Sequence, residues 1–268
     1  MAKSKAAFTV FTKPWKMPLP RLGKFVKDLG FDGVELPVRP GYQVEPEKAA
    51  KDLPRASKVL ADFGVKIGSI AGPTDERTFE ACAKAGVPIV RVCVGIDREI
   101  GYLASIAQLQ KEYDKLVPLL EKYGVAIGVQ NHCDYCVCNA MGIRHLIEKY
   151  NPRHVCAVLD FAHCGLNGEL PEMAIDIVWS HLRIANFKNA FWRRVNGPEA
   201  ETAEWECHWT TGRHGLASWP VAARELMRRN FTGDICLTAE YDNRESVDRL
   251  IAEDIRFAKS LFSGEPHA

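Results

Sequence analysis

The sequence predicts an α/β protein, a single-domain (β/α)8 TIM barrel, from three observations. Helical periodicity and short apolar runs alternate along all 268 residues without a break in composition, and about 250 residues is the usual size of such a barrel. The run at 155–159, Val-Cys-Ala-Val-Leu, is continuously apolar, as expected for a strand buried on both faces. A glycine followed by a valine, suited to ending a helix and starting a strand, occurs at Gly33, Gly64, Gly86 and Gly124.

This repeated unit gives the position of each element. Strands are expected near 7–11, 33–37, 65–70, 87–94, 125–131, 155–160, 182–187 and 234–240. Helices are expected near 18–29, 46–63, 75–85, 105–123, 139–150, 171–179, 217–229 and 244–261. Asp75 and Ser218 are the expected N-caps, and Pro46 and Pro171 suit a first helical turn. An open doubly wound sheet is the alternative, but the chain has no Gly-x-Gly-x-x-Gly and no Walker-type loop.

Charge and hydropathy argue against several classes of partner. The chain carries 35 Lys and Arg against 34 Asp and Glu, a net charge of +1, whereas nucleic acids and anionic membranes favour a basic surplus. No apolar run approaches the roughly 20 residues of a membrane-spanning helix, and the first residues lack the apolar stretch of a signal peptide. We therefore expect a cytoplasmic protein, without nucleic acid or membrane as partner, that forms one domain over residues 1–268 with short flexible tails.

The chain has nine cysteines, an odd number that suits reduced thiols better than a set of disulfides. Cys93, Cys156 and Cys236 lie in apolar strand-like runs and are expected to be buried. Another three form a Cys-x-x-Cys-x-Cys cluster at Cys133, Cys136 and Cys138. A structural zinc site usually needs a second ligand pair, and none follows in the sequence. These three are therefore expected to be incidental thiols of a loop, although their role stays open.

Polar residues stand where several of the expected strands end, which is the end of a barrel that carries its chemistry. Four of them can each offer an oxygen: Gln130, Asp160, Asn186 and Glu240. Oxygen ligands suit Mn²⁺ or Mg²⁺. Only two of the four are charged, so the sequence predicts a weakly bound divalent ion. The alternative is a hydrogen-bonded polar network without an ion.

The strand ends also carry a family resemblance, which covers about residues 7–262. The chain resembles the xylose-isomerase-like TIM-barrel superfamily, the sugar phosphate isomerase and epimerase family. That family ends its fifth strand with Glu-Asn-His, where this chain has Gln130-Asn131-His132. Its sixth strand ends with Asp and a His three residues later, matched by Asp160 and His163. Its seventh has His-x-x-Asp and its eighth a terminal Glu, where Asn186-Phe187-Lys188-Asn189 and Glu240 stand.

The resemblance implies a small-molecule sugar substrate, a divalent metal at the four strand-end positions, and proton transfer by two glutamates across a keto sugar. Gln130 stands at the first glutamate position, and a glutamine does not accept a proton as a carboxylate does. Glu240 is the retained carboxylate, and His132, His163 and Lys188 are the other candidate catalytic groups. Alternatives for single positions are a hydrogen-bonded structural histidine at 132 and a surface charge at 188.

Residues 190–216 are expected to form a long loop after the seventh strand, with tryptophans at Trp192, Trp205 and Trp209. Long loops of compact domains are commonly lids or binding segments. Indole faces stack on sugars, and guanidinium groups bind carboxylates or phosphates. The expected substrate-binding residues are Glu35, Trp15, Trp192 and Arg213. The alternative is that the tryptophans pack the loop on the barrel or form a subunit interface.

Together these features predict an enzyme of carbohydrate metabolism, an isomerase, epimerase or lyase that moves a proton next to a carbonyl. The alternative is a non-catalytic sugar-binding or regulatory barrel that lost the metal and one catalytic Glu, or a related dehydratase. An endonuclease-like function would need a His-rich multi-zinc cluster and a basic groove, and neither is present in the sequence. The sugar, its phosphorylation, the stereochemistry and whether the chain forms a homo-oligomer stay open.

Overall fold

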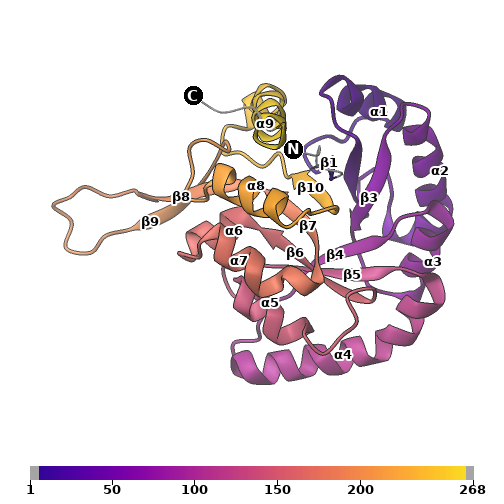
Figure 1. Ribbon diagram of the computed structural model, residues 1–268, viewed down its shortest axis with the longest axis horizontal. Helices are drawn as coiled ribbons and strands as arrows, with labels where there is room; N and C mark the ends of the chain where they lie inside the picture. Colours follow the sequence, from indigo (N-terminus) through magenta and orange to yellow (C-terminus); the bar gives the residue numbers. More distant parts are fainter. Residues whose placement is uncertain (1–5, 264–268) are drawn as a thin grey trace.

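The computed structural model describes residues 6–263; the tails expected at 1–5 and 264–268 lie outside the described residues. The barrel strands are β1 (Ala7–Phe11), β2 (Gly33–Pro37), β3 (Lys66–Ala71), β4 (Ile89–Cys93), β5 (Ala126–Gln130), β6 (Val155–Asp160), β7 (Leu182–Phe187) and β10 (Asp234–Leu237). They close in the order β1-β10-β7-β6-β5-β4-β3-β2, with parallel neighbours. The predicted single-domain TIM barrel is therefore confirmed (Figure 1).

Helices surround the barrel and return the chain to the start of each next strand (Figure 1). They are α1 (Leu19–Asp28), α2 (Ala49–Ala61), α3 (Glu76–Ala85), α4 (Gly101–Tyr123), α5 (Ala140–Ile147), α6 (Phe161–Leu166), α7 (Pro171–Val178), α8 (Trp219–Arg228) and α9 (Val247–Phe262). Short 3-10 turns occupy Pro46–Lys48, Trp179–His181 and Arg244–Ser246. The expected N-caps form: Asp75 accepts from the Thr78 N–H at 2.8 Å and Ser218 from the Val221 N–H at 3.4 Å.

The expectation that a Gly-Val pair ends a helix and begins a strand holds at Gly86 and Gly124 and fails at Gly33. Gly86 and Gly124 end α3 and α4 with φ of 71° and 64°, a conformation that glycine adopts without penalty. Gly33 ends no helix, because it is the first residue of β2. A Cβ there would lie 2.6 Å from the Lys66 carbonyl oxygen, so the close approach of β3 requires the glycine.

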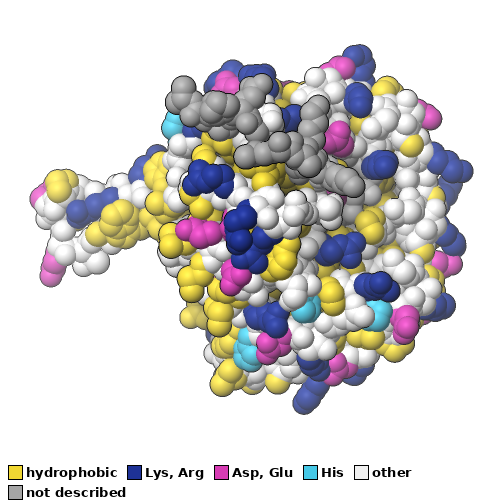
Figure 2. Space-filling view, in the orientation of Figure 1, with side chains coloured by type: hydrophobic (Ala, Val, Ile, Leu, Met, Phe, Trp, Pro, Cys, Tyr) yellow, Lys and Arg dark blue, Asp and Glu magenta, His cyan; other side chains and the backbone are white. Residues whose placement is uncertain are grey.

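The prediction that residues 190–216 form only a loop is wrong at two strands. Asn189–Arg194 (β8) and Trp205–Thr210 (β9) pair as an antiparallel hairpin, which projects away from the barrel (Figure 1). Hydrophobic side chains lie along this projecting arm (Figure 2), and Trp192 and Trp205 are exposed on it. The available signal was Asn196-Gly197, a common turn dipeptide between two aromatic segments.

Two hydrophobic layers hold the barrel together. The larger one lies between strands and helices, and a smaller cluster from seven strands includes Phe11, Ile89, Val158 and Ile184. Cys156 and Cys236 are buried as predicted, whereas Cys93 is exposed because it is the last residue of β4. All nine cysteines are free. Within residues 6–263 no helix is both long and apolar enough to cross a membrane.

Candidate active site

A cavity of about 530 Å³ opens at the carboxyl-terminal end of the barrel strands. The loops after β1, β2, β5, β7 and β10 and the base of the hairpin surround it. Its lining includes Lys13, Tyr42, His132, Lys188, Trp209 and Glu240. Barrel enzymes carry their active sites at this end, and the volume falls in the range of small-molecule sites. We refer to it as the mouth cavity.

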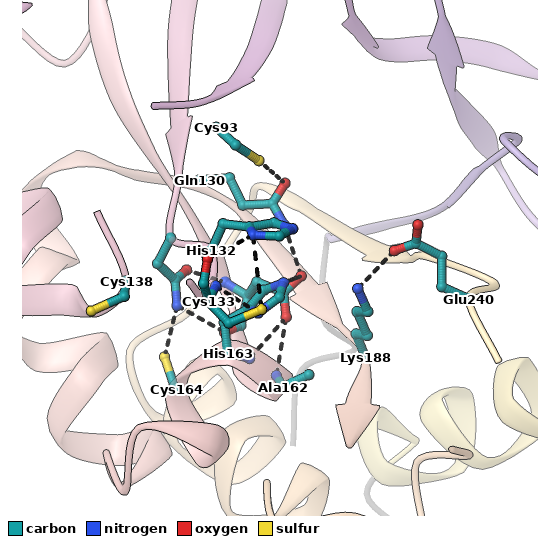
Figure 3. Close-up of polar contacts among 12 residues, drawn as sticks. Cys93, Gln130, His132, Cys133, Cys138, Ala162, His163, Cys164, Lys188 and Glu240 are labelled. Carbon is teal, nitrogen blue, oxygen red and sulfur yellow. Dashed lines mark hydrogen bonds and ion pairs between the residues drawn. The ribbon is translucent and has the colours of Figure 1, made fainter. Parts of the chain in front are cut away.

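Glu240 lies between two lysines in this cavity. Lys188 Nζ donates to its Oε2 at 2.7 Å, and Lys13 Nζ donates to its Oε1 at 2.5 Å. Figure 3 shows Lys188 reaching from the end of β7 toward Glu240. The Lys188 side chain is buried, and its ammonium lies 3.7 Å from the ring centroid of Trp209. Two positive charges therefore flank one negative charge beneath an indole face.

The two lysines set the chemistry of Glu240. Burial alone would raise the pKa of Glu240, but the charge of Lys188 and the hydrogen bonds from both lysines lower it to about 2. A general base works best when its pKa lies near the operating pH, so this carboxylate is a weak proton acceptor. The sequence predicts that Glu240 acts as a base. The geometry instead favours a role as the anion that positions the Lys188 ammonium.

His132 and His163 stack beside this ion-pair chain. Their ring centroids are 4.3 Å apart with the rings tilted by 36°, and the His163 and Trp209 rings make an edge contact with centroids 5.4 Å apart. His163 is fully buried. Burial, opposed by the charge of Asp160, lowers the pKa of His163 to about 4, so its ring is neutral near pH 7. His132 is only half-buried and lines the mouth cavity.

The ends of β5 and β6 are joined by a polar network. Asn131 accepts from the Asp160 N–H at 2.7 Å and donates to the Asp160 carbonyl at 3.0 Å. The side chain of Asp160 accepts from the N–H groups of Ala162 and His163 through Oδ1, which explains why the unexpected helix α6 begins there. Gln130 Nε2 donates to Asp160 Oδ2 at 2.8 Å. Asn131, to which the sequence analysis assigned no role, thus joins the ends of the two strands through its side chain.

The four expected metal ligands do not form an oxygen cage. Gln130 presents its N–H rather than its oxygen to Asp160, and both oxygens of Glu240 accept lysine N–H groups. Asn186 is buried beside Asp160, its neighbour in the β6–β7 register, and its amide has no hydrogen-bond partner within residues 6–263. Because Gln130 turns its N–H to Asp160 and lysines engage both oxygens of Glu240, this donor set does not fit a divalent ion.

A second group also brings metal-binding atom types together. His132, Cys133 and His163 place one ligand atom each within 4.8 Å of one another. Both imidazole Nδ1 atoms, however, already contact the Cys133 backbone at 3.0 Å. Burial, with Asp134 nearby, raises the pKa of the Cys133 thiol to about 12, so the free thiol is protonated near pH 7. The three residues are nevertheless a possible metal site, which an ion could occupy if the Nδ1 atoms left these contacts or the rings bound through Nε2.

We expect Gln130→Glu to create a cation site between the ends of β5 and β6. The new carboxylate would face Asp160 Oδ2, which now accepts the Gln130 N–H at 2.8 Å, and two like charges at that distance repel. Without metal the variant should melt at a lower temperature than the wild type, and Mn²⁺ should restore the loss. Thermal melts with and without Mn²⁺ test this. An equal Mn²⁺ response in both proteins would contradict it.

Two of the expected substrate-binding residues, Glu35 and Trp15, are buried and make contacts within the barrel instead. Glu35 is 1% exposed inside the barrel, where it pairs with the Arg91 guanidinium and accepts from Ser69 Oγ at 3.0 Å. Trp15 is buried, and its Nε1 donates to Asp248 at 2.7 Å. Both predictions are corrected, because neither side chain lines the mouth cavity.

The other two expected substrate-binding residues also lie away from the cavity. Trp192 is on β8, and its Nε1 donates to the Leu166 carbonyl at 3.0 Å, which fixes the hairpin to α6. Arg213 is exposed, with its guanidinium 3.8 Å from the Phe257 ring centroid. Of the three hairpin tryptophans, Trp209 lines the cavity. The hairpin register decides this, because it places Trp209 at the base of the arm opposite Ala190.

Comparison with known proteins places the fold. Residues 24–261 match the family described as xylose isomerase-like TIM barrel. A xylose isomerase domain protein from Planctomyces limnophilus superimposes with a TM-score of 0.72 at 14% identity, over 98% of this chain and 97% of that chain. The 3-keto-D-glucoside 4-epimerase of E. coli gives 0.71 at 11% identity, over 95% and 99%. D-psicose 3-epimerase from Clostridium cellulolyticum gives 0.69 at 12% identity, over 96% and 99%.

At these identities the solved structures show the shared fold and nothing finer. No curated protein matches the chain significantly. The family match extends from α1 to α9 and so includes seven of the eight barrel strands, and the barrel closes as that family requires. The chain belongs to the xylose isomerase-like TIM barrel family.

Proposed function

We propose that the protein is an enzyme that moves a proton at the carbon next to the carbonyl of a sugar or sugar acid. It would act as an isomerase, epimerase or related lyase, with the substrate in the mouth cavity. The observation that carries this proposal is the Lys188 ammonium, buried, held by Glu240 and facing the cavity beside His132. Two of the structurally similar proteins are named as epimerases of a keto-glucoside and of a ketose.

The chemistry follows from the charge that the reaction creates. Loss of a proton next to a carbonyl places negative charge on the carbonyl oxygen, and a preorganised cation in a dry site stabilises it. Lys188 is such a cation, and Glu240 holds it in place at 2.7 Å. The imidazole of His132 is the neighbouring group of the type that most often transfers protons. We propose that turnover needs no divalent ion, because the donor set does not fit one.

Proton exchange in heavy water tests the proposal without knowledge of the product. The purified protein would be incubated in D2O with ketoses, sugar acids and their phosphates, and loss of the proton signal next to the carbonyl followed by NMR. We expect one class to exchange, at a rate that EDTA does not change. Exchange that stops with EDTA and returns with Mn²⁺ would overturn the metal-free mechanism.

The same experiment separates the enzyme from a binding protein. A non-catalytic sugar-binding barrel is the second candidate, motivated by Gln130 at the position of a family base. Such a protein would give saturation-transfer signals from a bound sugar and no exchange with any member of the panel. That result would refute the enzyme and favour the binding barrel.

Glu240→Gln is expected to slow exchange by about 100-fold, because loss of one electrostatic group of this kind costs that much. The change leaves Lys13 and Lys188 close together without their shared anion. Initial exchange rates measure the effect, with Glu206→Gln on the exposed hairpin as the matched control. Wild-type rates in Glu240→Gln would refute the positioning role.

The pH dependence gives a further check on Glu240. In the folded protein its pKa is lowered to about 2. Its ion pairs are therefore intact at and above the pH at which an ordinary carboxyl group titrates, and they are lost only as the pH falls toward 2. When the exchange rate is measured against pH, its fall on the acidic side should therefore not be caused by protonation of Glu240.

Trp209→Ala is expected to weaken substrate binding about tenfold, roughly the effect of losing one aromatic contact of about 1.4 kcal/mol. Trp209 is half-buried and lies over Lys188 at the cavity, so its removal should change the melting temperature little. Trp205→Ala, on the exposed part of the same strand, is the control. A large fall in melting temperature with unchanged affinity would show that Trp209 supports the hairpin instead.

A further inference from the structure

The two stacked imidazoles at the mouth both contact one residue of the backbone. The N–H of Cys133 donates to His163 Nδ1 at 3.0 Å. His132 Nδ1 lies 3.0 Å from the Cys133 carbonyl oxygen. Figure 3 shows both rings close to Cys133.

Each contact dictates where its ring carries a proton. An amide N–H can only donate, so His163 Nδ1 must be unprotonated and the neutral ring carries its hydrogen on Nε2. A carbonyl oxygen can only accept, so His132 Nδ1 must carry the hydrogen. The neutral ring of His132 then has its lone pair on Nε2. The hydrogen bond at one nitrogen thus fixes the role of the other.

We infer that the Cys133 backbone holds His132 and His163 in opposite tautomers, and that His132 Nε2 is the single proton acceptor of a one-face transfer. This inference rests on the proposed function for its catalytic part. The tautomers themselves follow from the contacts alone.

The other groups of the mouth are engaged by protein partners. The carboxylate of Asp242, which also lines the cavity, lies 2.7 Å from His208 Nδ1 and accepts from the Trp209 N–H at 3.3 Å, both through Oδ2. Gln130 is neutral, and both oxygens of Glu240 are engaged by lysines. Asp160 accepts from Gln130 and from the first turn of α6, and it is fully buried. His163 carries its hydrogen on Nε2, which has no hydrogen-bond partner in the described part of the chain and lies 3.9 Å from Asp160 Oδ2. His163 is therefore a donor.

A single acceptor restricts the reaction class. Epimerisation with inversion at one carbon needs proton removal and return on opposite faces, whereas a one-base transfer returns the proton on the face it left. His132 Nε2 would take the proton from the carbon next to the carbonyl, and the electron pair would move to the carbonyl oxygen as an enolate beside Lys188. The proton now on Nε2 would pass to the former carbonyl carbon. At the same time the proton of the neighbouring hydroxyl would move to the former carbonyl oxygen, so that the hydroxyl oxygen becomes the new carbonyl. The result is aldose–ketose isomerisation with no external reactant.

Nitrogen NMR of protein labelled with ¹⁵N-histidine tests the tautomers directly. We expect His132 to be protonated at Nδ1 and His163 at Nε2, with the signals assigned by His132→Gln and His163→Gln. Cys133→Ser keeps the backbone and should keep both tautomers. Identical tautomers in the two rings would overturn the inference whatever the activity.

Cobalt tests the competing explanation of this cluster. If His132, Cys133 and His163 bound a metal, Co²⁺ would produce a thiolate charge-transfer absorption that Cys133→Ser removes. We expect no such band. Its appearance would show that Cys133 binds a metal within this cluster and would overturn the assignment.

Isotope transfer tests the one-base reaction. A substrate found in the exchange panel, deuterated next to its carbonyl, should give an isomer with part of the deuterium on the former carbonyl carbon. His132→Gln should slow this by at least about 100-fold, and His145→Gln, an exposed histidine of α5, should not. An epimer formed without isotope transfer would refute the single base. Expected tautomers with no exchange in any substrate would refute the proposed function and the catalytic part, while the tautomer assignment stands.

Discussion

Lys188→Met is expected to lower the rate of proton exchange by about 100- to 1,000-fold, the usual effect of removing one group that stabilises a developing oxyanion. Lys188 is the buried cation of the mouth cavity, 2.7 Å from Glu240 and 3.7 Å from the Trp209 ring centroid. Methionine keeps much of the side-chain volume beneath the indole and removes the charge. Glu240 keeps Lys13 as its partner, so the fold should persist.

The control for this variant is Lys24→Met on α1. Lys24 is exposed and pairs with Asp28 one helical turn away, so its loss should leave both rate and stability unchanged. Exchange rates and melting temperatures of both variants decide the outcome. A Lys188→Met protein that folds and exchanges as fast as the wild type would refute the ammonium as electrophile.

Arg91→Met is expected to destabilise the protein by about 3–5 kcal/mol, the typical effect of leaving a buried charge without its partner. Glu35 is 1% exposed inside the barrel, and the guanidinium of Arg91, itself 8% exposed, is its ionic partner. The hydroxyl of Ser69 would remain as a neutral hydrogen-bond donor at 3.0 Å. Urea denaturation followed by circular dichroism measures the loss.

A second variant distinguishes an unpaired charge from lost packing. Replacing both partners, Glu35→Leu with Arg91→Met, should recover most of the stability, because an apolar pair of similar volume needs no desolvation of charge. Lys84→Met, which breaks the exposed pair with Glu80, should change stability by less than about 1 kcal/mol. If the double variant is as unstable as Arg91→Met, packing rather than charge explains the loss.

Local patterns predicted the barrel and much of the mouth. Alternating helix and strand signals give closed (β/α)8 architecture, and polar residues after β5, β6, β7 and β10 meet at one end because parallel strands share their carboxyl edge. The family resemblance also indicated the pair Asp160 and His163, whereas the helix α6 that begins between them was not expected. The hairpin at β8 and β9 was missed, although Asn196-Gly197 marked its turn region.

The sequence by itself determined the fold and the residue types at the mouth, because strand and helix periods are local properties of the chain. Only the tertiary structure decided which side chains contact one another. Barrel closure brings Lys13 of the first loop to Glu240 after the last strand, and turns Glu35 inward to Arg91 instead of toward a substrate. The Cys133 backbone contacts that fix both imidazoles depend on loop geometry. The spacing of residues along the chain does not predict such contacts. They depend on how side chains distant in sequence are oriented and buried once the barrel has closed.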